Sequence, residues 1–95
     1  MKKVQINTQE YEIVKNKDDC FSLEEVLEKV TDYFDTYDYI FGDYAYDKLR
    51  LKGFNDSTSQ NVRDINNIKN LDSYIEKYCA YGARYFLLKK VNKNL

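Results

Sequence analysis

The chain has 95 residues, 43 % of them hydrophobic and 16 % aromatic, and its 15 basic and 16 acidic side chains leave a net charge of -1. This length corresponds to one domain, residues 1–95, and the aromatic content excludes a chain that is disordered over most of its length. The charge balance excludes a protein that coats DNA or binds membranes through a polybasic surface.

The residue types present exclude several common kinds of catalytic, metal and phosphate-binding site. The chain has no histidine and only two cysteines, so it lacks the usual general base and cannot build a zinc site from these residues alone. Its three glycines do not form the patterns of phosphate-binding loops. No stretch approaches about 18 apolar residues, and the start of the chain does not resemble a signal peptide. We therefore expect a cytoplasmic protein without a metal, a cofactor or a membrane partner.

The first predicted elements are a β-hairpin and a helix. Hydrophobic residues alternate with polar ones on both sides of a polar break at Asn7-Thr8, which is typical of two short strands joined by a turn. Ser22 and Glu25 then form a capping box, a combination that begins helices. Hydrophobic residues follow at helical spacing as far as Phe34, and this spacing predicts a helix over residues 22–35.

A second hairpin is expected in the middle of the chain. Residues 37–44 are rich in aromatic residues that favour strands, and residues 46–54 follow as another strand. Gly42 is expected to mark a bulge or the approach to the turn. The second strand carries leucines on one face and cations on the other, namely Leu49 and Leu51 against Lys48, Arg50 and Lys52.

In the C-terminal part, a polar loop is expected over 55–61, followed by an unassigned segment over 62–68 with a turn at Asn66-Asn67. A helix capped by Asn70 is then expected to end before Gly82. A strand over 83–91 and a frayed end at 92–95 complete the chain. The last strand is apolar on both faces, so we expect it inside the sheet. The order is therefore β-β-α-β-β-(unassigned)-α-β. It predicts a two-layer α+β domain, in which two amphipathic helices pack on one side of a largely antiparallel sheet of four to six short strands.

Charge is divided along the sequence. Residues 1–47 contain five bases and twelve acids, whereas residues 48–95 contain ten bases and four acids. Such a division can produce separate acidic and basic surfaces. It can equally be neutralised in space, because pairing of the two central strands brings aspartates of the first close to cations of the second.

Two long blocks of the sequence resemble the signatures of the YutD-like family, a group of small bacterial proteins without an assigned function. The blocks are Tyr37-Asp-Tyr-Ile-Phe-Gly-Asp-Tyr-Ala-Tyr-Asp-Lys-Leu-Arg-Leu-Lys-Gly-Phe54 and Leu71-Asp-Ser-Tyr-Ile-Glu-Lys-Tyr-Cys-Ala-Tyr-Gly-Ala-Arg-Tyr-Phe-Leu-Leu-Lys-Lys90. Tyr44 replaces the tryptophan usual in the family, and Ala83 replaces a frequent cysteine. The resemblance implies a shared fold and a common origin with this family, but it implies no catalysed reaction.

The central hairpin is the candidate binding surface. Ten tyrosines are many for this length; most are expected to pack at the edge of the core, but an exposed cluster over 37–46 would suit a protein interface, where tyrosine is enriched. We expect a non-enzymatic protein that docks a protein partner through residues 37–54. The candidate binding residues are Asp43, Tyr44, Tyr46, Lys48, Arg50 and Lys52.

Other functions stay open from the sequence. The cations of the second strand, interleaved with Tyr46, could hold RNA or single-stranded nucleic acid. The aspartates between 35 and 47 could hold a divalent cation, although their spacing matches no calcium loop. Cys20 precedes a helix whose dipole would lower the thiol pKa and favour redox sensing, whereas Cys79 is expected in the core. An enzyme using Asp with Tyr or Arg would need a pocket where they converge.

Overall fold

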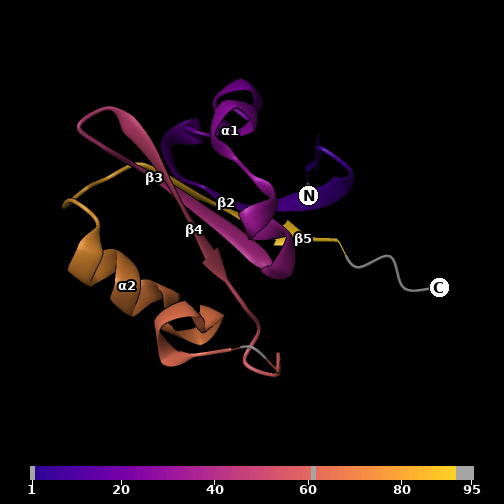
Figure 1. The fold of residues 1–95 in the computed structure, drawn as a ribbon. Helices are drawn as coiled ribbons and strands as arrows, with labels where there is room; N and C mark the ends of the chain where they lie inside the picture. The colour runs from indigo at the N-terminus through magenta and orange to yellow at the C-terminus, as the bar shows by residue number, and fades with distance from the viewer. Residues whose placement is uncertain (1, 61, 92–95) are drawn as a thin grey trace.

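The computed structural model describes residues 2–60 and 62–91 (Figure 1). Its five strands form one antiparallel sheet in the order β1-β2-β5-β3-β4. The strands are β1 (Lys3–Ile6), β2 (Gln9–Asn16), β3 (Tyr39–Ala45), β4 (Lys48–Phe54) and β5 (Tyr85–Lys90). The α-helices are α1 (Leu23–Lys29) and α2 (Leu71–Tyr78), and the short 3₁₀ turns are η1 (Lys17–Asp19), η2 (Asp32–Thr36), η3 (Asp64–Asn66) and η4 (Ile68–Asn70). The predicted α+β class and antiparallel sheet are confirmed.

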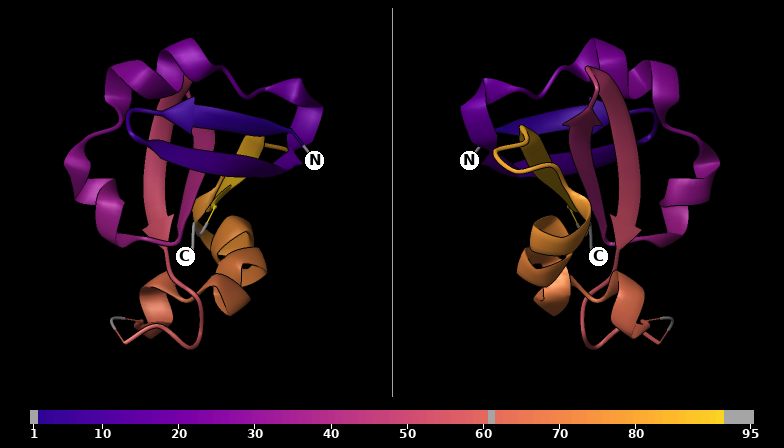
Figure 2. Two further views of the ribbon diagram at one scale, coloured as in Figure 1. Left: turned by 90° about the vertical axis from the view of Figure 1, so that its right-hand side faces the viewer. Right: turned by 90° about the vertical axis from the view of Figure 1, so that its left-hand side faces the viewer.

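The two helices pack on opposite faces of the sheet, so the expectation that both share one face is wrong (Figures 1 and 2). Ile40 and Phe86 point into the core beneath α1, whereas their neighbours Phe41 and Leu87 point into a second core beneath α2. The physical reason is that β3 and β5 are apolar on both faces. A strand of this kind needs cover on both sides.

The N-terminal hairpin forms as predicted, with Asn7 in its turn at a φ of 56°. The first helix begins as predicted, because the Ser22 hydroxyl accepts the Glu25 N–H at 3.4 Å. It ends at Lys29 instead of residue 35. Val30 is extended, and the Thr31 hydroxyl accepts the Tyr33 N–H at 3.3 Å to start η2. Two adjacent β-branched residues favour this break.

The second helix forms where it was predicted, but its ends differ. The Asn70 side chain does not cap the helix and donates a hydrogen bond to the Asp64 carbonyl at 3.1 Å. The helix stops at Tyr78, and Gly82 adopts a φ of 72° in the turn that follows. The strand after it lies between β2 and β3, which confirms its predicted internal position. The fraying expected for residues 92–95 lies outside the described residues.

Two glycines of the central hairpin lie beneath aromatic rings. Gly42 sits in the middle of β3, where a Cβ would come within 2.2 Å of the Phe86 ring. The prediction of a bulge there is wrong, because Gly42 provides room for a ring and not for a turn. Gly53 of β4 lies in the same way beneath the ring of Tyr37, where a Cβ would approach within 2.3 Å. This contact holds Tyr37 against the outermost strand of the sheet.

Candidate functional site

The central hairpin turns through two residues, Tyr46 and Asp47, which have φ values of 53° and 62°. Both belong to the turn, so β4 begins at Lys48 and not at Tyr46 as predicted. The predicted register within β4 is confirmed: Leu49 is buried on the α1 side, and Arg50 lies on the α2 side with 46 % of its side chain exposed. The cationic face therefore lies on the side that α2 covers, and it is not free of helices as expected.

Asp43 and Arg50 form an ion pair across β3 and β4. The Arg50 Nε donates to Asp43 Oδ1 at 3.1 Å, and Nη2 donates to the other carboxylate oxygen and to the Tyr78 carbonyl at 3.2 Å. The hydrogen bond to Asp43 raises the pKa of Arg50. Burial and the same carboxylate raise the pKa of the nearby Cys79 thiol to about 11. Asp43 is only 2 % exposed and therefore does not meet solvent. Through Arg50 it links β3 to β4 and to the end of α2.

Tyr44 lies on the opposite face, beneath α1. Its hydroxyl donates to Glu25 Oε2 at 3.1 Å, and the Arg84 guanidinium lies 4.6 Å from the ring centroid. Burial and the hydrogen bond to Glu25 raise the pKa of Tyr44 to about 12. Burial likewise raises the pKa of the neighbouring Cys20 thiol, so the expected lowering by the helix dipole is wrong. Tyr44 thus anchors α1 to the sheet.

The six predicted binding residues do not share one surface. Asp43 and Tyr44 are buried on opposite faces, whereas Tyr46 is fully exposed at the hairpin tip and Lys48 is exposed beside it. Arg50 and Lys52 are partly covered on the α2 side. Four of the six therefore keep access to solvent, and the two buried ones have structural partners. Within residues 2–60 and 62–91, no group of three or more acidic or cysteine side chains is arranged to hold a metal ion.

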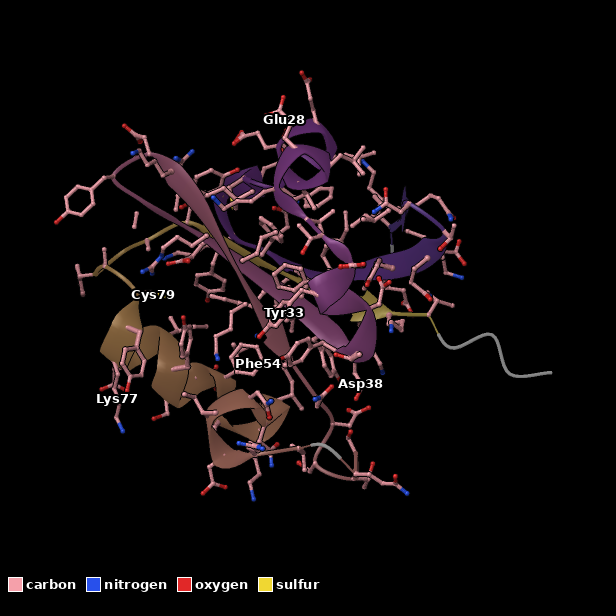
Figure 3. All side chains as sticks on the ribbon, in the orientation of Figure 1. Glu28, Tyr33, Asp38, Phe54, Lys77 and Cys79 are labelled. Carbon is pink, nitrogen blue, oxygen red and sulfur yellow. The ribbon has the colours of Figure 1, made fainter. Side chains whose placement is uncertain are left out.

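A row of tyrosines crosses the outer edge of the sheet at Lys52. We call Tyr33, Tyr37, Lys52, Tyr74 and Tyr78 the tyrosine belt. On the α1 side, the Tyr33 and Tyr37 hydroxyls are 3.0 Å apart. On the α2 side, the Lys52 ammonium lies 5.3 Å from the centroid of the Tyr74 ring, which is 5.2 Å from that of Tyr78. Burial lowers the pKa of Lys52, and nearby Tyr33 opposes this shift. Tyr33 and the buried Phe54, whose ring also contacts Lys52, are labelled in Figure 3.

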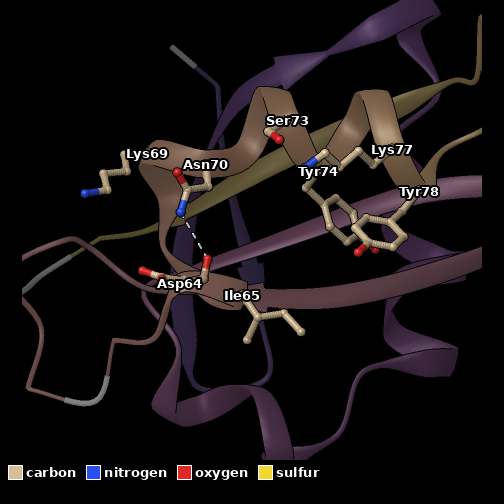
Figure 4. Close-up of a pocket in the computed structure, with 8 residues that line it drawn as sticks. All are labelled: Asp64, Ile65, Lys69, Asn70, Ser73, Tyr74, Lys77 and Tyr78. Carbon is tan, nitrogen blue, oxygen red and sulfur yellow. Dashed lines mark hydrogen bonds between the residues drawn. The ribbon is translucent and has the colours of Figure 1, made fainter.

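The belt continues into an open groove of about 640 Å³ between α2 and the two turns η3 and η4. Figure 4 shows its lining residues, with the rings of Tyr74 and Tyr78 side by side: Asp64, Ile65, Lys69, Asn70, Ser73, Tyr74, Lys77 and Tyr78. Three large side chains around this region are mostly exposed: Tyr33 at 63 %, Ile65 at 71 % and Tyr78 at 64 %. The groove and the belt together offer apolar area with hydroxyl and ammonium groups interspersed.

Sequence reasoning missed most of the belt. The helical spacing of Leu71, Tyr74, Ile75, Tyr78 and Cys79 predicts one apolar stripe on the second helix, yet Tyr78 is largely exposed. Tyr33 was not singled out for binding, because the predicted helix continued past it. The residue type could have indicated this surface. Tyrosine has an apolar ring and a polar hydroxyl, so tyrosines on one side of a helix suit a partly solvent-exposed surface better than leucines do.

Comparison with known proteins agrees with this fold. A family described as "Putative antitoxin YutD-like" matches residues 5–89. "Putative antitoxin YutD" of Bacillus subtilis is 42 % identical over 88 residues, which cover 93 % of this chain and 97 % of that protein. The solution NMR structure of protein yutD from B. subtilis superposes with a TM-score of 0.80 at 39 % identity and covers 100 % of this chain and 86 % of that one. Within the described residues, no helix is both long and apolar enough to span a membrane.

Proposed function

Since this chain belongs to the YutD-like family, we propose that it is a small non-enzymatic protein of the cytoplasm that docks a protein partner. The B. subtilis relative carries the name putative antitoxin. An antitoxin protein that neutralises its toxin by binding has to present an exposed recognition surface. The name thus favours a binding protein, and we propose a protein toxin or its target as the partner of this chain.

The exposed tyrosines at the β4 edge carry this proposal. Tyr33 and Tyr78 are each more than half exposed on either side of Lys52, and Ile65 adds an exposed aliphatic side chain. Tyrosine and other amphipathic aromatic residues are enriched at protein interfaces and dominate their binding energy. The alternative is that these rings have no binding role and are simply exposed to solvent, as single exposed hydrophobic residues often are. Their convergence on one edge and one groove favours docking.

The same geometry makes nucleic acid the weaker candidate. Of the three cations on β4, Arg50 is bound to Asp43 and to the Tyr78 carbonyl, and Lys52 is partly buried over aromatic rings. Lys48 is the one of the three that is both exposed and without an ion pair or aromatic contact among the described residues. Binding of phosphates by counterion release requires several free cations along one track.

Affinity purification of the tagged full chain from its native host, with and without nuclease, tests the proposal. We expect one stoichiometric protein partner that survives nuclease. The double variant Tyr33→Ala, Tyr78→Ala should lose this partner while keeping the wild-type melting temperature, because both side chains are largely exposed. Tyr46→Ala, which removes a fully exposed tyrosine at the hairpin tip, is the matched control and should retain the partner. Retention by the double variant, or loss of the partner on nuclease treatment, would refute docking through the belt.

A further inference from the structure

The register of the central hairpin fixes which backbone groups of β4 face outward. A two-residue turn makes Ala45 and Lys48 a hydrogen-bonded pair, and such pairs then alternate along the strands. The N–H and C=O groups of Lys48, Arg50 and Lys52 therefore point to β3, and those of Leu49 and Leu51 point away from the sheet. Across the described residues, β4 is paired with β3 alone.

The chain itself forms an isolated β-bridge on this edge, just beyond the end of β4. Asn55 has the same outward phase as Leu49 and Leu51, and it forms a parallel bridge with Asn67. Its N–H donates to the Asn66 carbonyl at 2.7 Å, and its carbonyl accepts the Ile68 N–H at 2.9 Å. The outward backbone groups of this edge are thus competent to pair with an extended segment.

The side chains beside this edge on the α2 side are mostly cationic. Lys69 and Lys77 line the groove. Lys48 and Lys52 have no ion pair within 4 Å among the residues that the structure describes. Of the acids on this side, Asp43 is already bound to Arg50, and Asp64 lines the groove together with the two lysines.

The α1 side of the edge has the opposite character. There Glu25, Glu28, Lys29 and Lys48 border a hollow of about 310 Å³ that reaches Leu49. A strand added to β4 would send alternate side chains to the two sides. Those on the α2 side would meet cations and tyrosines. Those on the α1 side would meet Leu49 and Leu51, beside two glutamates and two lysines whose charges balance, and this setting suits neutral apolar residues.

We propose that the edge of β4 binds an extended segment of the protein partner as a sixth strand, with acidic side chains toward Lys48 and Lys52 and apolar ones toward Leu49 and Leu51. The proposal rests on the proposed docking function and names the chemistry of its partner. Addition of a strand to an exposed sheet edge is a common mode of peptide recognition. A second copy of this chain does not fit, because antiparallel pairing of two β4 strands would place like charges opposite each other, which is destabilising.

Amide hydrogen exchange on the ¹⁵N-labelled full chain tests the pairing. The probes are an acetylated nonapeptide of alternating glutamate and valine, its matched version with lysine in place of glutamate, and oligouridylate. We expect the glutamate peptide to slow exchange of the Leu49 and Leu51 amides by about tenfold or more, whereas those of Arg50 and Lys52 are protected with or without it. The lysine peptide should bind at least about tenfold more weakly, and the preference should fall as salt rises.

The outcomes separate this inference from the docking function. Unchanged exchange at Leu49 and Leu51 with the glutamate peptide, equal binding of the lysine peptide, or protection by oligouridylate alone would overturn the added strand. If the partner captured from the host leaves these two amides unprotected, strand addition is wrong and docking stands. If no protein partner is captured, docking itself fails.

Discussion

The ion pair between Asp43 and Arg50 provides a sharp test of how the central hairpin is held. Arg50→Met keeps an unbranched apolar stem but removes the guanidinium that binds the Asp43 carboxylate and the Tyr78 carbonyl. Asp43 is 2 % exposed, so the variant leaves a buried carboxylate without its cation. The lost contact to Tyr78 also loosens the end of α2.

The expected cost follows from this burial. Removing one partner of a fully buried ion pair costs about 3–5 kcal/mol. Here the Arg50 side chain is 46 % exposed, so solvent partly screens the pair from the arginine side. We therefore expect a loss of about 2–3 kcal/mol in the free energy of unfolding, which lowers the melting temperature of a domain of this size by roughly 8–24 °C.

Urea unfolding followed by circular dichroism at pH 7 measures this loss. Lys48→Met is the matched control, because it removes an exposed cation from the same face of β4, and we expect it to change stability by less than about 0.5 kcal/mol. The double variant Asp43→Leu, Arg50→Met removes both charges and should recover part of the loss. Equal stability of Arg50→Met and Lys48→Met would refute the structural role assigned to the pair.

Two further predictions concern the core. Gly42→Ala should destabilise the fold by about 3 kcal/mol or more, or prevent folding, because its methyl group would collide with the Phe86 ring; thermal unfolding measures this, and a melting temperature within a few degrees of wild type would contradict the packing. Tyr44 has a pKa raised to about 12 in the folded state, above its ordinary value of 10.0, so its contribution is complete below pH 10 and is lost as pH rises toward 12. Urea unfolding should therefore show wild type losing about 1–3 kcal/mol more than Tyr44→Phe over this window, and parallel pH profiles would contradict the burial of the hydroxyl.

Local signals in the sequence were sufficient for most elements. The Ser22 cap and the alternation of Leu49 and Leu51 with cations depend on neighbouring residues, and both predictions are confirmed. The end of the first helix was missed because helical spacing continues to Phe34 across a break that local hydrogen bonds at Thr31 impose. The placement of the two helices on opposite faces follows from strands that are apolar on both faces, and this pattern was recognised for the last strand only. Tyr39-Ile40-Phe41 is as apolar on both faces as the last strand, which requires a helix on each side.

The binding surface was harder to predict because it joins distant parts of the chain. Tyr33 and Tyr78 are separated by 45 positions in the sequence, and only the twist of the sheet and the opposite placement of α1 and α2 bring both to the β4 edge. No periodicity within one element can reveal such a surface. The cysteines show the same limit, since burial in the assembled fold raises both thiol pKa values and outweighs the helix dipole expected at Cys20.

The fold neutralises only part of the charge difference between the acidic first half and the basic second half of the chain. Pairing of β3 with β4 neutralises part of it, since Asp43 binds Arg50, and the hairpin tip adds a long contact of 3.8 Å between Asp47 and Arg84. These are the ion pairs within 4 Å among residues 2–60 and 62–91. Most cations that follow β4 are therefore not paired with the acidic N-terminal half, and two of them, Lys69 and Lys77, line the groove beside the tyrosine belt. A partner segment that supplies carboxylates there would complete a neutralisation that the fold leaves unfinished, which is why we expect the β4 edge to prefer acidic segments over basic ones.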